Sequence, residues 1–93
     1  MSKTYIVRSK SGCPHCVIAK EALLQAGHEY VEEIYDDFDE RQRMYDSLGL
    51  VGDKRTVPQV TLITEGGHGR AHTYIGDAKA TVDHLNEQKE TFF

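Results

Sequence analysis

Two cysteines with two residues between them, in the stretch Cys13-Pro14-His15-Cys16, carry the clearest chemistry in this sequence. This spacing fits the first turn of a helix and brings both sulfurs close enough for a reversible disulfide. Pro14 suits the first helical position because it has no amide hydrogen and its φ angle is fixed. Cys13 then lies at the start of the helix, where free backbone amides and the helix dipole favour a thiolate. We predict that Cys13 is the nucleophile and Cys16 the resolving thiol.

Length and composition restrict the class of protein. A chain of 93 residues predicts one domain, residues 1–93, and we expect a monomer. The formal net charge of −4 disfavours a general nucleic-acid binder. The apolar run at residues 4–8 is too short for a signal peptide, and no segment reaches the ~20 apolar residues of a membrane span. We therefore expect a cytoplasmic protein, where such a cysteine pair is catalytic or metal-binding rather than a structural disulfide.

Residue patterning predicts a strand, a helix and a second strand around the cysteine pair. Residues 4–8 and 28–35 are rich in β-branched and aromatic residues, which indicates strands. Between them, residues 14–26 place four apolar side chains on one helical face, and Gly27 ends the helix; the four are Ala19, Ala22, Leu23 and Ala26. Because a strand-helix-strand unit crosses over in a right-handed sense, we expect the two strands to be parallel.

The rest of the chain predicts a helix, a hairpin and a last helix. An acidic, solvated turn at residues 36–40 leads into a helical pattern that ends at Gly49, with Asp39 and Gln42 as its capping box. Two β-branched runs, residues 60–63 and 71–75, flank a glycine-rich turn and predict an antiparallel hairpin. A final helix is expected to open at Gly76-Asp77 and to run to about Lys89, with its inward side chains at Ala78, Val82 and Leu85. The predicted fold is α/β, with a four-stranded mixed sheet flanked by three helices in the order β-α-β-α-β-β-α.

Three motifs together resemble the glutaredoxin family of the thioredoxin superfamily. They are Lys10-x-x-Cys13-Pro14-x-Cys16, Thr56-Val57-Pro58-Gln59 and Ile75-Gly76-Asp77, spaced as in small bacterial and viral dithiol glutaredoxins. The resemblance covers nearly the whole chain and implies a thioredoxin-like fold. It also implies a thiol-disulfide oxidoreductase with glutathione as reducing co-substrate. The implied clients are disulfide-containing proteins, with ribonucleotide reductase as one candidate.

The resemblance further implies where glutathione binds. Pro58 is expected to be cis, so that the Val57 backbone faces Cys13 and pairs with the tripeptide. The glycine carboxylate of glutathione is assigned to Lys10 and Gln42, with Arg41 and Arg55 as nearby cations. The γ-glutamyl end is assigned to Asp77 and the helix start after Gly76. The predicted glutathione-binding set is Lys10, Cys13, His15, Gln42, Arg55, Thr56, Val57, Pro58, Gly76 and Asp77.

Two positions depart from the family pattern. Gly76-Asp77-Ala78-Lys79 stands where many glutaredoxins have two glycines followed by small and acidic residues. His15 stands where tyrosine is common, and Cys-Pro-His-Cys resembles the motif of the oxidising periplasmic member of the superfamily. Two interpretations of His15 stay open. Either it tunes the pKa of the Cys13 thiol together with Lys10, or it is a solvated loop residue.

Three alternative functions also stay open. The first is a glutaredoxin-like thioredoxin that thioredoxin reductase reduces. The second is a glutathione-ligated [2Fe–2S] cluster protein, which Pro14 disfavours. The third is a scaffold that uses the Thr-Val-Pro groove only for docking. We expect no metal site, because the remaining histidines lack ligand spacing; they are His28, His68, His72 and His84.

Overall fold

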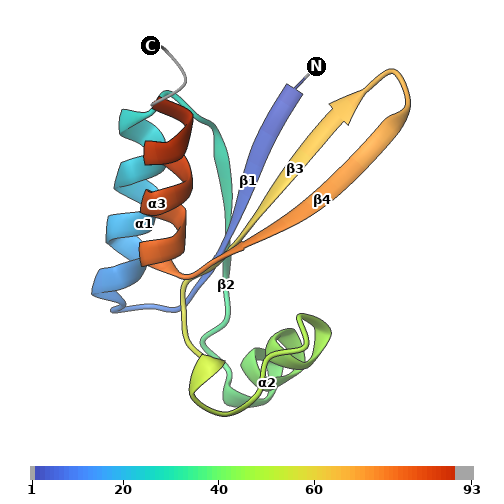
Figure 1. The fold of residues 1–93 in the computed structure, drawn as a ribbon. Helices are drawn as coiled ribbons and strands as arrows, with labels where there is room; N and C mark the ends of the chain where they lie inside the picture. Colours follow the sequence, from blue (N-terminus) through green and yellow to red (C-terminus); the bar gives the residue numbers. More distant parts are fainter. Residues whose placement is uncertain (1, 90–93) are drawn as a thin grey trace.

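The elements follow the predicted order, with one short 3-10 helix added (Figure 1). They are β1 (Ser2–Ser9), α1 (Pro14–Gln25), β2 (Tyr30–Ile34), α2 (Phe38–Ser47), η1 (Gly52–Lys54), β3 (Gln59–Gly66), β4 (Gly69–Gly76) and α3 (Ala78–Lys89). The computed structural model describes residues 2–89, so residues 1 and 90–93 of the predicted domain lie outside the described residues. The predicted fold class is confirmed.

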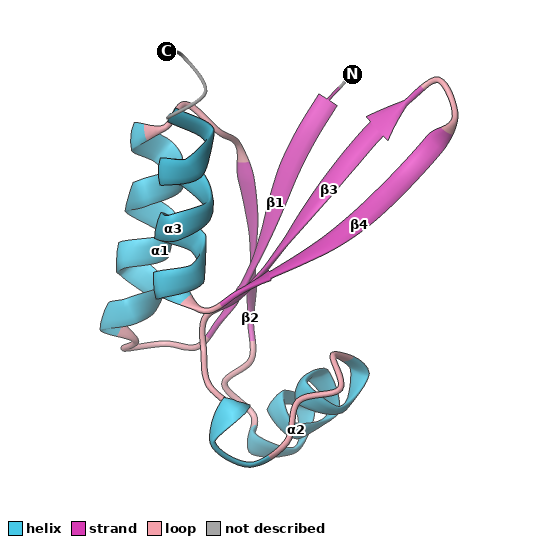
Figure 2. Ribbon diagram, viewed as in Figure 1, coloured by secondary structure: helices cyan, strands magenta, loops and turns pink. Residues whose placement is uncertain are grey.

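The four strands form one sheet in the order β2-β1-β3-β4. β1 is parallel to β2, with Tyr5 opposite Tyr30, which confirms the expected crossover. β3 is antiparallel to β1, and β4 is antiparallel to β3. Arg8, near the end of β1, therefore lies opposite Gln59 at the start of β3. The loops that carry Cys13 and Pro58 thus meet at the same end of the sheet (Figure 2).

α1 begins and ends where the sequence predicts. Cys13 is its N-cap and Pro14 occupies the first turn, where a missing amide hydrogen costs nothing. Ala26 is the C-cap, and Gly27 follows with a φ of 81°, a left-handed conformation that glycine adopts without strain. Small residues on the inward face let α1 pack closely, and α1 and α3 lie side by side over one face of the sheet (Figure 1).

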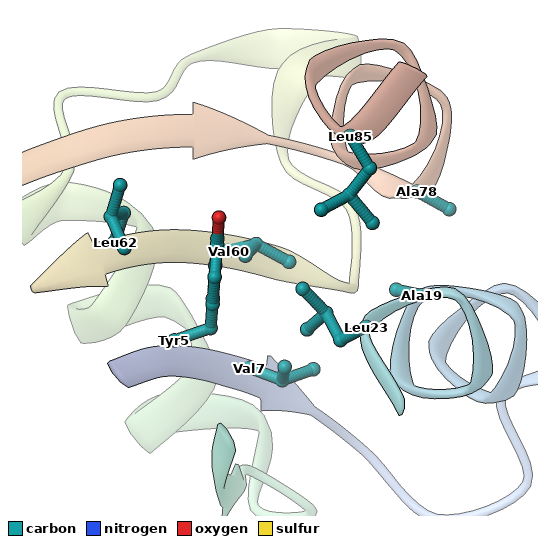
Figure 3. Packing of buried hydrophobic residues seen from close by; sticks show 8 residues of the cluster. All are labelled: Tyr5, Val7, Ala19, Leu23, Val60, Leu62, Ala78 and Leu85. Carbon is teal, nitrogen blue, oxygen red and sulfur yellow. The ribbon is translucent and has the colours of Figure 1, made fainter. Parts of the chain in front are cut away.

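The core lies between the sheet and these two helices (Figure 3). Its buried members are Tyr5 and Val7 from β1, Val60 and Leu62 from β3, Ala19 and Leu23 from α1, and Ala78 and Leu85 from α3. The Tyr5 hydroxyl is hydrogen-bonded to Nε2 of His84, at 3.0 Å, so its polar atom is satisfied inside the core. The tight packing anchors β1 and α1, the two elements that flank the cysteine pair.

α2 differs from the prediction at its N-terminus. The N-cap is Asp37, whose carboxylate accepts a hydrogen bond from the Glu40 amide at 3.0 Å. The predicted capping box of Asp39 and Gln42 was therefore wrong, because both residues lie inside the helix. Asp37 fits the same capping-box spacing, since Glu40 follows it three positions later, so the sequence alone did not decide between the two aspartates. α2 lies at the end of the sheet, apart from α1 and α3 (Figure 1).

The hairpin and the last helix complete the chain. β3 and β4 turn at Gly67 and His68, as the glycine-rich stretch predicted. In α3 the prediction for Val82 was wrong in part, since Val82 is only half-buried while Thr81 is fully buried. The Thr81 hydroxyl donates to the Asp77 carbonyl at 2.8 Å, so this buried polar group keeps a hydrogen-bond partner. None of the helices in residues 2–89 has the length and apolar character needed to cross a membrane.

Candidate active site

The two cysteines form a disulfide at the N-terminus of α1. Their Cα atoms are 5.3 Å apart, within the usual range for such a bond. As N-cap, Cys13 presents its Sγ to the Cys16 amide, which donates to it at 3.2 Å. Cys13 is half-buried, whereas Cys16 is only 2% exposed. A client sulfur can therefore reach Cys13, while Cys16 is placed to attack Cys13 from inside.

The Val57–Pro58 loop lies against the disulfide. The Val57–Pro58 peptide bond is cis, which confirms what the family resemblance implied. The Val57 carbonyl oxygen is 3.7 Å from Cys13 Sγ, so a reduced Cys13 thiol can donate to it. The backbone of Val57 is thus next to the reacting sulfur, where an extended peptide can pair with it.

Beside this loop is a cleft of about 250 Å³, which we call the proline cleft. It brings together five predicted site residues from α1, the loop before β3 and the start of α3, namely His15, Thr56, Val57, Pro58 and Asp77. Asp77 caps α3, because its Oδ1 accepts a hydrogen bond from the Ala80 amide at 2.9 Å. The cleft thus contains the backbone of the Thr56–Pro58 loop and a helix N-terminus, two features suited to a small peptide carrying a carboxylate.

A second cleft, of about 470 Å³, contains the cysteines themselves; we call it the β2 cleft. Cys13, Cys16 and Lys10 line it together with residues of α1 and β2. The structure therefore places Lys10 beside Cys13, as predicted, but in a different cleft from Val57 and Asp77. The two clefts share no lining residue.

Comparison with known proteins identifies the family. The family model described as Glutaredoxin matches residues 5–65, well over half of the chain. This chain belongs to the glutaredoxin family. No curated protein matches this glutaredoxin at a significant level.

Solved structures show that the fold of this glutaredoxin is thioredoxin-like. Glutaredoxin 1 from Francisella tularensis, crystallised with cacodylate, superimposes with a TM-score of 0.72 at 21% identity, over 96% of this chain and 99% of that chain. Glutathione transferase Omega 2S from Trametes versicolor superimposes with a TM-score of 0.62 at 17% identity. That match covers 94% of this chain and 38% of the transferase. The family together with the Cys13–Cys16 pair indicates a thiol-disulfide oxidoreductase.

The remaining predicted glutathione ligands of this glutaredoxin lie elsewhere. The Arg55 guanidinium donates to Gln42 Oε1 and to the Leu50 carbonyl, each at 2.8 Å, and also pairs with Asp46. Gln42 and Arg55 thus link α2 to the loop after it, and neither lines the proline cleft or the β2 cleft. Their role toward glutathione stays a prediction. Gly76 ends β4 with a φ of 126°, just before Asp77.

Two polar contacts at the site were missed by the sequence analysis. Asp36, expected in a solvated turn, accepts hydrogen bonds from the Ser11 amide at 2.7 Å and the Ser11 hydroxyl at 2.6 Å. These bonds lower the pKa of the Asp36 carboxyl and fix the loop before Cys13. Gln59, only 2% exposed, donates to the Thr56 carbonyl at 2.7 Å and accepts from the Tyr74 hydroxyl. No sequence signal links Ser11 to Asp36. Gln59 belongs to the Thr56-Val57-Pro58-Gln59 motif of the family resemblance, but that motif gave Gln59 no role.

A charged network lines the β2 cleft beneath the cysteines. Glu32 Oε2 accepts hydrogen bonds from the Ser9 hydroxyl at 2.6 Å and the Lys20 ammonium at 2.9 Å. The Lys20 bond, followed by the Ser9 bond, lowers the pKa of the Glu32 carboxyl below its ordinary value. Within residues 2–89 no group of three or more His, Cys, Asp or Glu side chains is arranged to hold a metal ion.

Proposed function

We propose that this glutaredoxin is a dithiol enzyme that reduces protein disulfides and glutathione mixed disulfides, with glutathione as its reductant. The observation that carries the proposal is the asymmetry of the cysteine pair. Cys13 is accessible, accepts the Cys16 amide and faces the Val57 carbonyl, whereas Cys16 is buried directly behind it. A dithiol exchange needs one thiol that meets the client and one that meets only its partner.

The reaction follows from this arrangement. The Cys13 thiolate, which the helix N-terminus and the Cys16 amide stabilise, attacks one client sulfur. The other client sulfur leaves as a thiolate and takes up a proton. In a protein client, Cys16 then attacks Cys13 Sγ, releases the client thiol and forms the Cys13–Cys16 disulfide. Two glutathione molecules restore the dithiol and leave as oxidised glutathione.

We assign glutathione to the proline cleft. The Val57 backbone there supports pairing with the tripeptide, and the α3 N-terminus supports binding of the γ-glutamyl carboxylate. We further propose a cytoplasmic, monomeric protein, since a reducing compartment keeps such a cysteine pair in its active dithiol form. Client proteins such as ribonucleotide reductase belong to this proposal.

The test is an NADPH-coupled assay of glutathione mixed-disulfide reduction. Two electron sources are compared, glutathione with glutathione reductase, and thioredoxin reductase alone. We expect turnover only with glutathione. Turnover only with thioredoxin reductase would instead support the thioredoxin-like alternative.

A pair of variants tests the assignment to the proline cleft. Asp77→Asn keeps the cap of α3, because asparagine caps as well as aspartate, but removes the carboxylate from the cleft. The Asp77 carboxylate is assigned to the γ-glutamyl ammonium, while the amides of the α3 N-terminus face the γ-glutamyl carboxylate. We expect the KM for glutathione to rise about threefold to tenfold, the effect of losing one partly exposed charge contact of about 1 kcal/mol. Glu87→Gln is the matched control, since it removes the same charge at an exposed position of α3 that lies outside the proline cleft. An equal KM in both variants would contradict the assignment.

A further inference from the structure

The β2 cleft has no role in the proposed binding of glutathione, except for Lys10. Its walls come from the loop before Cys13, the first two turns of α1 and the end of β2. Because Cys13 lines this cleft, whatever occupies it lies next to the reacting sulfur. Its volume of about 470 Å³ falls within the range of about 300–1,000 Å³ typical of binding sites.

Apolar side chains are exposed on both walls of the β2 cleft. Val17 on α1 is 47% exposed, and Ile34 on β2 is 57% exposed. Single exposed apolar residues are common, but these two face one cleft together beside the catalytic disulfide, so they form an apolar surface that a bound segment can cover. Pro14, also exposed, adds to this apolar surface at the end nearest Cys13.

The charges of the β2 cleft differ from those of the whole chain. The chain has a formal net charge of −4, whereas the charged residues that line the cleft are Lys10, Lys20 and Glu32. Lys20 and Glu32 pair with each other at 2.9 Å, which leaves Lys10 as the cation offered to a ligand. Asp36 lies nearby, and its carboxylate stays ionised because the hydrogen bonds from Ser11 lower its pKa, so it offsets part of the Lys10 charge. The cleft therefore complements an apolar segment that carries a carboxylate.

The position of β2 favours a polypeptide over a small ligand. β2 is an edge strand, and within residues 2–89 no further strand lies beyond it. The end of β2 that lines the cleft is thus at the edge of the sheet, where no neighbouring strand among the described residues blocks a polypeptide that extends beyond it (Figure 1).

We propose that the β2 cleft receives the client polypeptide, as a segment with an apolar residue against Val17 and Ile34 and a carboxylate near Lys10. The inference rests on the proposed function, in which glutathione uses the proline cleft. The Cys13 thiolate attacks the client cysteine sulfur held at the cleft and forms a mixed disulfide. The former partner sulfur leaves as a thiolate. Cys16 then displaces the client thiol, so the client is reduced and the protein dithiol is oxidised.

The experiment measures single-turnover rates with the pre-reduced protein and no glutathione. The substrates are thionitrobenzoate mixed disulfides, which release the same coloured thiol at the first attack. One contains an octapeptide with leucines beside its cysteine and a glutamate, the second an octapeptide with serines and a lysine, and the third N-acetylcysteine. We expect the wild-type protein to react about tenfold faster with the first peptide than with the second.

Two cleft variants and two matched controls locate the effect. Val17→Ser and Ile34→Ser should each slow the leucine peptide about tenfold, as expected for losing one apolar side-chain contact. Both should slow N-acetylcysteine much less, because this substrate has no chain that could lie along the cleft. Leu24→Ser, on the same helix, and Val31→Ser, on the same strand, make the same kind of change at residues that are 59% and 50% exposed but lie outside the cleft. These controls should alter neither rate.

Two results would overturn the inference. Unchanged leucine-peptide rates in both cleft variants would show that no client chain lies in the β2 cleft. Equal losses with the peptide and with N-acetylcysteine would show that Val17 and Ile34 act on Cys13 itself. Because the assay contains no glutathione, it gives an answer even if the coupled assay finds no glutathione dependence. The N-acetylcysteine rate also reports whether each variant is folded at its active site.

Discussion

At the level of single residues, Cys13 and Cys16 have the same side chain but differ in their exposure to solvent. Cys13 caps α1 and meets solvent, whereas Cys16 is one turn further along the helix and buried. The helix N-terminus favours the thiolate of Cys13 most strongly, because the effect fades within the first turn. In the proposed mechanism, the burial of Cys16 restricts it to attack on Cys13.

The two serine substitutions should therefore differ. Cys13→Ser should reduce all thiol exchange to the uncatalysed rate, since a serine hydroxyl is not ionised near neutral pH. Cys16→Ser should keep most reduction of glutathione mixed disulfides and lose most reduction of protein disulfides. Steady-state rates on both substrates check this prediction. Similar losses in both variants would contradict the assigned roles.

Tyr74 is connected to the loop beside the proline cleft through Gln59. Its hydroxyl donates to Gln59 Oε1, and Gln59 Nε2 holds the Thr56 carbonyl beside the proline cleft. Tyr74→Phe leaves a buried acceptor without this donor, which should cost about 1 kcal/mol of unfolding free energy. We also expect about a threefold higher KM for glutathione, because the Thr56–Val57 backbone is held less firmly.

Urea unfolding and steady-state kinetics measure these two effects. Tyr35→Phe is the control, since the Tyr35 hydroxyl donates to Glu33 on the exposed surface. A lower stability of Tyr74→Phe with an unchanged KM would mean that the Gln59 contacts are structural only.

At the level of secondary-structure elements, Glu32 links β2, β1 and α1 near the cysteine loop. It lies on β2 and accepts hydrogen bonds from Ser9 on β1 and Lys20 on α1. The carboxylate with its two donors fixes the angle between the strand pair and the helix that presents Cys13. Its side chain and that of Lys20 are 26% and 23% exposed, so solvent screens the pair only in part.

Glu32→Gln should lower the unfolding free energy by about 1 kcal/mol at neutral pH. The pKa of Glu32 is lowered in the folded state from its ordinary value of 4.5, mainly by the Lys20 bond. Its contribution is therefore complete above the unfolded pKa and is lost as the pH falls through the lower folded pKa. The difference between wild type and variant should be constant above about pH 5.5 and shrink below pH 4.5.

Urea unfolding at several pH values tests this dependence. Glu29→Gln removes the same charge at an exposed position just before β2 and should change stability little at any pH. A difference between Glu32→Gln and wild type that grows at low pH would contradict the assignment.

At the scale of the whole molecule, stability is concentrated away from the β3–β4 hairpin. The core contains side chains from β1, the first half of β3, α1 and α3 (Figure 3). Residues 69–74 of β4 are, in contrast, all exposed. The outer half of the hairpin diverges from α1 and α3 (Figure 1). Because its residues 65–74 are all exposed, it adds little buried apolar surface.

Amide hydrogen exchange should follow this division. Amides of β1 at Tyr5 and Val7 should exchange only through global unfolding, because β1 is paired on both sides and buried. Amides near the hairpin turn, at residues 66–70, should exchange at least a hundredfold faster through local opening. Equal protection of both segments would show that the hairpin unfolds only with the rest of the molecule.

Local sequence determined the elements and the chemistry of this protein, because these depend on neighbours along the chain. Pro14 and Gly27 bound α1, the glycine-rich turn makes the hairpin, and the cysteine spacing defines the redox pair. Where two local signals competed, as for Asp37 and Asp39, the choice of cap could not be predicted.

Only the tertiary structure decided which distant residues share a site. The register of β1 with β2 and β3 brings Glu32 to Ser9 and Val57 to Cys13, and the site is divided into the proline cleft and the β2 cleft. The tertiary structure also brings Arg55 within hydrogen-bonding distance of Gln42. The physical reason is that such contacts depend on strand pairing and helix packing between residues 13 or more positions apart, which no local pattern of side chains encodes.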